Sequence, residues 1–226
     1  MHNYTLIRSG RKSAALHIKP DATVEVRAPL RMPKADIDKF VISKESWINR
    51  KLVLVRERQE KKAAFNLNYG DDVMVFGKEC IIVPSSAANP AGYDDERLYI
   101  PPNLTSEQIK HACIRIYKLI AGQVLINKTV AFSKLMGVEP RAVKISSAKT
   151  LWGSCSKQRS INYSWRLVMT EDYVIDYVVV HELAHITEMN HSDRFWAIVA
   201  DLLPDYKVRR KRLKILQQRL RGEDWD

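Results

Sequence analysis

Three histidines and a glutamate that lie close together in the sequence could form a reactive metal site. Residues 181–185 read HELAH, and His191 follows six residues after His185. Positions i and i+4 of an α-helix share one face, so His181 and His185 can face the same ion. Neutral imidazole is a preferred zinc ligand, and three protein ligands leave one tetrahedral position for water. The pattern therefore predicts one divalent ion per chain, zinc, held by His181, His185 and His191.

Glu182 directly follows the first of these histidines. One residue along a helix is a rotation of about a quarter turn, so Glu182 can reach the water without binding the ion itself. Zinc lowers the pKa of a bound water to about 7, and a nearby carboxylate can then accept its proton. We therefore predict a metal-dependent hydrolase in which Glu182 is the catalytic base.

A buried helix is expected to carry this motif. The residues before it are strongly apolar, as in Val174, Ile175 and the run 178–180. Thr170 is positioned to cap the helix, and Glu171 suits the positive end of its dipole. An apolar sequence on all sides is typical of a helix inside the protein.

His191 can join the other two histidines only if the helix ends before it. Six more helical residues would carry it about 9 Å along the axis, beyond reach of a shared ion. Asn190 is the residue best suited to a left-handed turn, and Ser192 can cap a second helix that contains Phe195 and stops at Pro204. His191 is therefore expected at the elbow between two helices.

The remaining pattern predicts an α+β fold. In the N-terminal part we expect strands within 3–32, a helix from Pro33 to about Lys62, a hairpin turning at Gly77-Lys78, a loop over 85–92 and a strand over 97–100. Further on we expect a long helix from the Thr105 and Gln108 capping box to Gly137, and strands over 142–147 and 161–168. We place a β-rich subdomain with its helix at 1–103 and the metal-dependent hydrolase domain at 104–226.

Composition narrows the setting of the protein. The 226 residues carry a net charge of +11 and include three widely spaced cysteines. An odd, scattered set of cysteines suits a reducing compartment, and neither a signal peptide nor a long apolar span is apparent. We therefore expect a cytoplasmic protein without a membrane partner. The positive charge favours acidic partners such as nucleotides or nucleic acid, and the oligomeric state is left open.

Several segments together resemble a known family. They are WGSC at 152–155, WRL at 165–167, the stretch 174–185, NHS at 190–192 and FW at 195–196. In this combination the chain closely resembles the YgjP-like metal-dependent hydrolases, which are similar to the zincin metallopeptidases of the WLM and SprT types. The resemblance extends over nearly the whole chain and is most specific between Lys149 and Trp196.

The resemblance implies a zincin-like α/β metallohydrolase domain around the HExxH helix. By position, His181, His185 and His191 match the family's metal ligands, and Glu182 matches its catalytic glutamate. Leu151 departs from the pattern, because members usually have arginine there, and Tyr163-Ser164 replaces a Leu-Asn pair. The family is classed with the metallopeptidases, although some members are described as UTP pyrophosphatases.

Other residues have weaker signals. Trp152 and Trp165 could stack on a nucleobase, but large aromatic residues in apolar segments more often belong to the core. Cys155 is more readily interpreted as a small buried residue than as a metal ligand. Asp176 and Tyr177 precede the first histidine by about a turn, so either could orient it or simply make a surface contact.

Three classes of function fit these observations. The first is a metallopeptidase that hydrolyses peptide bonds, which we prefer. The second is a metal-dependent nucleoside triphosphate (UTP) pyrophosphatase, which the net charge favours. The third is a non-catalytic nucleic-acid-binding module in which zinc is structural. Separately, residues 207–221 are expected to form a basic amphipathic helix, which is usually a solvated face but could recruit a polyanion. The intact Glu182 disfavours the third class, because a structural zinc site needs no base.

Overall fold

The protein, seen here as a computed structural model that describes residues 2–225, divides into two compact units. The first unit contains residues 2–65 and 221–224, and the second contains residues 66–220 with Trp225. The sequence predicts a boundary at 103–104, whereas the structure places residues 66–103 in the second unit. The mixed α+β class that the sequence predicts is confirmed.

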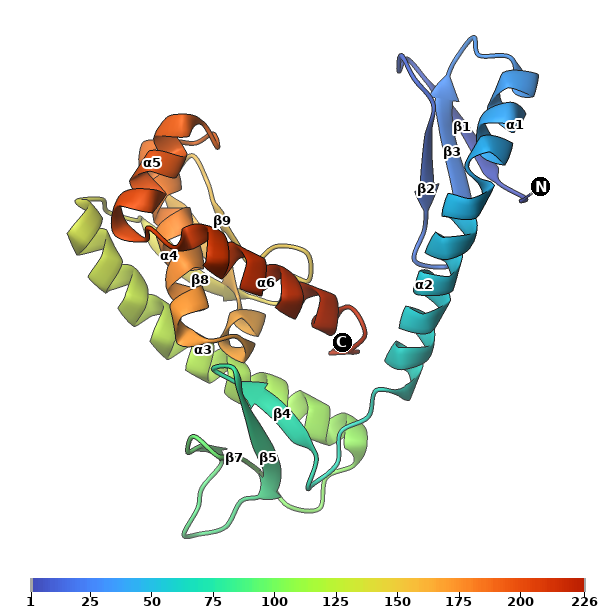
Figure 1. The fold of residues 1–226 in the computed structure, drawn as a ribbon. Coiled ribbons are helices and arrows are strands. Elements are labelled where there is room, and N and C mark those ends of the chain that lie inside the picture. Colours follow the sequence, from blue (N-terminus) through green and yellow to red (C-terminus); the bar gives the residue numbers. More distant parts are fainter. Residues whose placement is uncertain (1, 226) are drawn as a thin grey trace. The chain divides into compact units, whose positions relative to one another are not determined.

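The first unit is a small sheet covered by two helices (Figure 1). Its elements are β1 (Thr5–Ser9), β2 (Ala15–Ile18), β3 (Val24–Pro29), α1 (Lys34–Ser43) and α2 (Glu45–Ala64). The strands run in the order β1-β3-β2, and β3 pairs in parallel with β1 and antiparallel with β2. Val26, Ala28, Ile37 and Ile48 form the centre of its core and are fully buried.

The single helix predicted from Pro33 to about Lys62 is wrong, because the structure has two helices that meet at Lys44. Neither proline nor glycine marks this break in the sequence. Ile37 and Val41 are buried from the first helix, and Ile48 and Leu52 from the second, all in the same core. Tertiary packing of two apolar faces therefore decides the break, which local propensity does not announce.

The second unit holds the histidine motif. Its elements are β4 (Asp72–Val75), β5 (Lys78–Pro84), β6 (Gly92–Tyr93), β7 (Arg97–Ile100), α3 (Ser106–Met136), β8 (Ala142–Ser146), β9 (Gly153–Cys155), β10 (Ser160–Ser164), the 3-10 helix η1 (Trp165–Met169), α4 (Asp172–Thr187), α5 (Asp193–Leu202) and α6 (Tyr206–Leu220). One sheet has the order β4-β5-β7-β6 and the other β8-β10-β9. The capping box at Thr105 and the left-handed Gly137 bound α3, as predicted.

The hairpin of β4 and β5 belongs to the second unit through specific hydrogen bonds. The Phe76 amide donates to the Val168 carbonyl at 2.7 Å, and the Tyr117 hydroxyl donates to the Met74 carbonyl at 2.9 Å. These bonds join residues more than forty positions apart, so the sequence pattern gave no sign of them. They explain why the unit begins at residue 66 and not at 104.

Two local predictions in this unit are wrong. The hairpin turns at Phe76-Gly77, one residue earlier than predicted, and both residues have positive φ. The strand predicted over 161–168 ends at Ser164, where the Ser164 hydroxyl accepts a hydrogen bond from the Arg166 amide and starts η1. All five residues of η1 are buried, and a short apolar run of this kind does not distinguish a strand from a buried helical turn.

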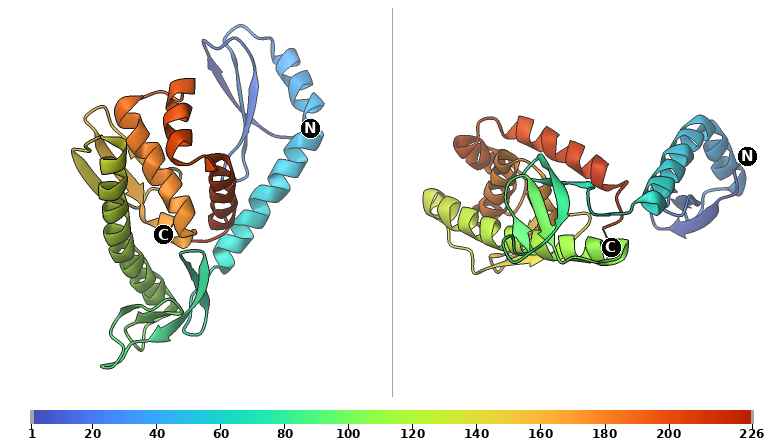
Figure 2. Two further views of the ribbon diagram at one scale, coloured as in Figure 1. Left: turned by 60° about the vertical axis from the view of Figure 1, so that its left-hand side comes forward. Right: turned by 90° about the horizontal axis from the view of Figure 1, so that it is seen from below.

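Helix α4 is the central element of the second unit. It packs against α3 on one side and against α5 and α6 on the other, with β9 beside it (Figure 2). Its apolar residues between Val174 and Ala184 are buried, which confirms the expected interior helix. No helix within residues 2–225 has the length and hydropathy needed to cross a bilayer.

The N-terminus of α4 differs from the prediction that Thr170 caps it. The cap position is Glu171, and no side chain accepts a hydrogen bond there. The Thr170 hydroxyl instead donates to the Glu171 carboxylate at 2.8 Å. Arg212 of α6 donates to the same carboxylate at 2.6 Å, so this end of the helix is fixed by side chains from two elements.

Candidate metal centre

The structure brings the three predicted histidines together at the C-terminal end of α4. Their ring nitrogens provide one atom each, and these atoms lie within 4.8 Å of one another. The Nε2 atoms of His181 and His191 are 3.1 Å apart. Two imidazoles that share a tetrahedral zinc at 2.0–2.1 Å would have their nitrogens about 3.3 Å apart. The spacing therefore fits a shared metal ion.

The chain reaches this arrangement by leaving the helix early. Helix α4 ends at Thr187, and Glu188 is extended with φ −135° and ψ 103°. The prediction that Asn190 turns the chain in a left-handed conformation is wrong, because its φ is not positive. Ser192 then caps α5 by accepting a hydrogen bond from the Phe195 amide, as predicted. His191 lies between the two helices, at the expected elbow.

Glu188 also orients the second histidine. Its carbonyl oxygen lies 3.1 Å from Nδ1 of His185, which leaves Nε2 of that ring free for an ion. A backbone acceptor on the distal nitrogen fixes both the ring orientation and the tautomer in many metal sites. The extended conformation at Glu188 therefore both ends the helix and sets the geometry of the site.

One aromatic side chain packs against all three histidine rings. Phe195 is fully buried, and its ring centroid lies 4.9, 4.5 and 4.8 Å from those of His181, His185 and His191. Trp196 stacks on His191 with 5.6 Å between centroids and an interplanar angle of 25°. The rotamers of the three histidines are thus restricted by packing before any ion binds.

The electrostatics of the site suit neutral ligands. Burial, followed by the neighbouring His185, His191 and Arg210, lowers the pKa of His181 to about 3. Burial also lowers the pKa of His185. Nδ1 of His181 is buried without a hydrogen-bond partner. Because only a neutral imidazole can bind a metal, this donor set fits a divalent ion of the zinc type.

Glu182 lies in a tight, buried position next to the three histidines. Its side chain is buried, and burial raises the pKa of the carboxyl to about 8. Gly153 of β9 faces it so closely that a Cβ there would lie 2.6 Å from Glu182 Oε1. The glycine therefore makes room for the carboxylate, and the strand holds that carboxylate against α4.

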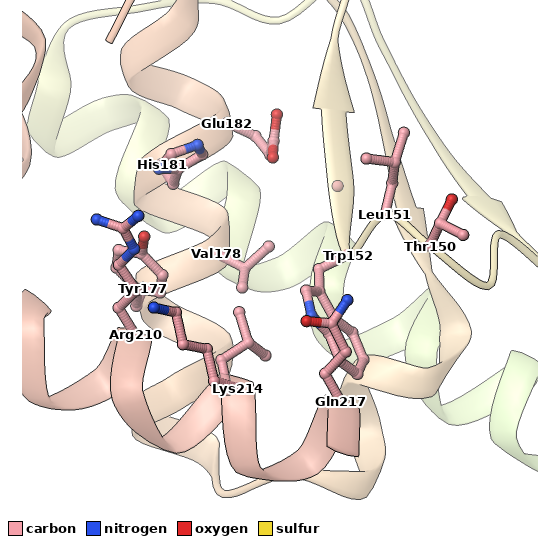
Figure 3. Close-up of a pocket in the computed structure, with 12 residues that line it drawn as sticks. Thr150, Leu151, Trp152, Tyr177, Val178, His181, Glu182, Arg210, Lys214 and Gln217 are labelled. Carbon is pink, nitrogen blue, oxygen red and sulfur yellow. The ribbon is translucent and has the colours of Figure 1, made fainter. Parts of the chain in front are cut away.

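A pocket of about 240 Å³ opens beside His181 and Glu182 (Figure 3). Helix α6 contributes Arg210 and Lys214 to one wall, while Leu151 and Trp152 come from the segment leading into β9. The pocket is large enough for part of a substrate. It connects the candidate metal ligands to a surface with both charged and apolar groups.

Asp176 and Tyr177, about one helical turn before His181, have different surroundings. The Tyr177 ring lies 5.7 Å from that of His181 and lines the pocket. Asp176 instead accepts a hydrogen bond from Lys128 at 2.6 Å and pairs with Arg209 at 3.7 Å. Asp176 thus ties α4 to α3 and α6, and only Tyr177 contacts the site.

The remaining candidate residues also differ in their burial and contacts. Trp165 is fully buried and stacks on Tyr117 at 5.4 Å, as expected of a core residue. Trp152 is only partly buried and lines the pocket, which differs from the core position that we favoured. Cys155 is partly buried, and burial together with Glu182 raises the pKa of its thiol to about 11. It is not part of the histidine cluster found among the described residues.

The profile of the YgjP-like metallopeptidase domain matches residues 12–216, which is most of the chain. The chain belongs to the YgjP-like family. As a member, it is a metallopeptidase-like hydrolase of a family that implies a divalent metal. No curated protein sequence matches the chain.

Two solved structures resemble part of this YgjP-like protein. One is the metallopeptidase zymogen abylysin of Pyrococcus abyssi, with 23% identity and a TM-score of 0.35 over 42% of this chain and 90% of that one. The other is the metallopeptidase zymogen jannalysin of Methanocaldococcus jannaschii, with 20% identity and a TM-score of 0.36 over 42% of this chain and 95% of that one.

The sequence did not indicate that Gly153, Arg210 and Lys214 lie at the site, or that Phe195 packs against the histidine rings. Phe195 was expected only as an apolar residue of its helix. The spacing of Arg210 and Lys214 signals a shared helix face, but a basic helix more often presents such a face to solvent. Only the packing of α6 beside α4 shows that this face borders the histidines.

Proposed function

We propose that this YgjP-like protein is a zinc-dependent peptidase with Glu182 as its catalytic base. The observation that carries the proposal is the buried Glu182 carboxylate beside three convergent histidines and an open pocket. A purely structural zinc site would need neither the carboxylate nor the pocket.

His181, His185 and His191 would hold the ion. A bound zinc supplies Lewis acidity, which acidifies water and polarises a carbonyl group. The chain's own contribution is to lower the pKa of His181 and His185 by burial, and to hold the rings through packing against Phe195 and through the Glu188 carbonyl.

Glu182 moves the proton during hydrolysis. It accepts a proton from the attacking water as the new C–O bond forms, and donates it to the amine nitrogen as the C–N bond breaks. Burial raises the pKa of the Glu182 carboxyl, which favours the proton-donating step, and the positive charge of a bound ion would favour the carboxylate that accepts the proton. Gly153 limits the positions that this side chain can take.

The second candidate is a nucleoside triphosphate (UTP) pyrophosphatase. It is favoured by one specific feature, the presence of Arg210, Lys214 and the partly exposed Trp152 in the same pocket. Cationic groups can bind phosphates, and an indole can stack on a base. We place it second because phosphates can also be bound on an exposed basic surface without any metal-centred chemistry.

The two candidates can be separated with matched proteins. Wild type and Glu182→Gln are loaded with zinc and incubated with an unfolded protein and, separately, with a panel of nucleoside triphosphates, each with and without chelator. We expect peptide cleavage by the wild type that chelator abolishes and that Glu182→Gln reduces by ~10²-fold or more. Metal content and thermal stability of the variant should stay unchanged.

Chelator-sensitive, Glu182-dependent release of pyrophosphate without peptide cleavage would replace the proposal by the second candidate. Cleavage that persists in Glu182→Gln would remove this residue from the mechanism. Stimulation of peptide cleavage by DNA would identify nucleic acid as a partner, with helix α6 as the candidate contact surface.

A further inference from the structure

Four basic residues of α6 form two pairs with different surroundings. Arg209 pairs with Asp205 at 2.8 Å and donates to the Tyr173 carbonyl at 2.7 Å. Arg212 binds the Glu171 carboxylate. These two side chains attach α6 to the N-terminal part of α4, and their charge is used within the protein.

Arg210 and Lys214 form the other pair. Both line the pocket, and neither has an ion pair with any carboxylate of the described chain. They are four residues apart on one helix, so their side chains lie on the same face. Figure 3 shows both side chains projecting from α6 on the side of the pocket where His181 and Tyr177 lie.

Arg210 is held close to the metal centre by an aromatic contact. Its guanidinium carbon lies 5.3 Å from the centroid of the Trp196 ring. That ring is 5.6 Å from His191 and 5.9 Å from His181. A guanidinium above an indole face is restrained by a cation–π contact and keeps its hydrogen-bond donors available. The guanidinium is therefore held against the same indole ring that packs on His181 and His191.

The opposite wall of the pocket is apolar. Leu151 is 58% exposed and lines the pocket together with Trp152, and Val178 of α4 and Leu213 of α6 add further apolar surface. The exposed leucine side chain lies in the same pocket as the buried Glu182. An apolar side chain of a substrate can therefore pack against it. The pocket thus offers apolar contacts from Leu151 and Trp152 and two cations from α6 that have no carboxylate partner within residues 2–225.

We propose that Arg210 and Lys214 form a carboxylate-binding subsite, which makes the enzyme selective for peptides with a carboxylate close to the scissile bond and an apolar side chain beside it. This inference rests on the proposed peptidase function and names its substrate class. The carboxylate is supplied either by an acidic side chain or by a free C-terminus, since both present the same oxygens to a guanidinium and an ammonium.

Binding can be measured without turnover in a zinc-loaded Glu182→Gln background. Isothermal titration calorimetry would use three N-acetylated peptides of equal length that share a central leucine. One has an internal glutamate and an amidated C-terminus, one has glutamine and a free C-terminus, and one has glutamine and an amidated C-terminus. The comparison identifies which carboxylate, if either, is recognised.

A charge-matched control is available on the same helix. Arg210→Gln/Lys214→Gln removes the two pocket cations, and Lys207→Gln/Lys211→Gln removes two exposed cations with the same spacing that do not line the pocket. We expect one carboxylate peptide to bind about ten-fold more tightly than the neutral peptide. The pocket variant should lose this difference, while the control variant should keep it.

The inference is overturned if the carboxylate preference survives in the pocket variant or is lost equally in the control. It is also overturned if UTP, and no carboxylate peptide, depends on Arg210 and Lys214 for binding. Its failure is distinguishable from that of the proposed function. Cleavage of peptides by the wild type without a carboxylate preference rejects only the subsite, whereas a carboxylate preference in binding without any cleavage rejects only the peptidase.

Discussion

Gly153 and Glu182 lie so close together that a methyl group on the glycine would overlap the carboxylate. The built Cβ position is 2.6 Å from both Cγ and Oε1 of Glu182. Because φ at this glycine is not in the left-handed region, its importance is one of space and not of backbone conformation. An added side chain would therefore act on Glu182 before it acts on the fold.

Gly153→Ala is expected to displace Glu182 and reduce turnover by about 10²-fold, because a shift of about 1 Å at a catalytic group has effects of that size. Zinc content should stay at the wild-type value, because Gly153 faces Glu182 and not the three histidines. Activity, metal content and thermal midpoint are measured together. Gly122→Ala is the control, since nothing lies within 4 Å of its Cβ position on α3. Unchanged activity in Gly153→Ala would show that Glu182 has other productive positions.

At the scale of elements, the β4–β5 hairpin supports the N-terminal end of α4. Its turn residue Gly77 has φ +78°, and a Cβ there would lie 2.5 Å from Glu171 Cγ and 3.2 Å from the Glu171 amide nitrogen. Glu171 is the cap residue of α4 and also binds Arg212 of α6. The turn, the helix start and α6 thus meet at one carboxylate.

Gly77→Ala should therefore cost more than a glycine replacement that affects backbone conformation alone. Gly137 has φ +62° and nothing within 4 Å of its Cβ position, so Gly137→Ala measures that conformational term, about 1 kcal/mol. For Gly77→Ala we expect a loss of about 2–4 kcal/mol in the free energy of unfolding. Urea denaturation, followed through the unfolding transition of the second unit, gives the free energy of unfolding of each variant. Equal losses would show that the hairpin moves away from α4 at little cost.

At the scale of the whole molecule, the candidate metal centre belongs to one of the two compact units. The proposed ligands His181, His185 and His191 all belong to the second unit. The first unit has its own buried core between its sheet and its two helices. An ion that binds only the folded second unit stabilises that unit by mass action.

Zinc is therefore expected to slow amide hydrogen exchange within residues 66–220 and to leave residues 2–65 unaffected. The stabilisation is about 2.7 kcal/mol when free zinc is one hundred times its dissociation constant. Exchange measured by mass spectrometry with zinc and with chelator tests this expectation peptide by peptide. His185→Ala, which lacks one ligand, should show no zinc-dependent protection. Equal protection of both segments would mean that the units unfold as one.

The convergence of the three histidines could be predicted from the sequence because the spacing of two of them is a property of one helix and the third precedes a capping residue. His181 and His185 share a face through the helical period, and Ser192 marks the start of the next helix by its capping chemistry. The long helix after Thr105 was predicted for the same reason, since a capping box is a local signal. These features depend on residues that are close together in the sequence, so the sequence alone determined them.

Tertiary structure alone decided what lies around the ligands. Phe195 under the three rings, Gly153 against Glu182, and Arg210 with Lys214 in the pocket all come from contacts between elements. The same holds for the break at Lys44 and for the turn of the chain at Glu188, where side-chain packing and a hydrogen bond to His185 outweigh local preference. A periodic pattern reports which face of an element is apolar, whereas the partner that covers that face depends on the long-range packing of the whole unit.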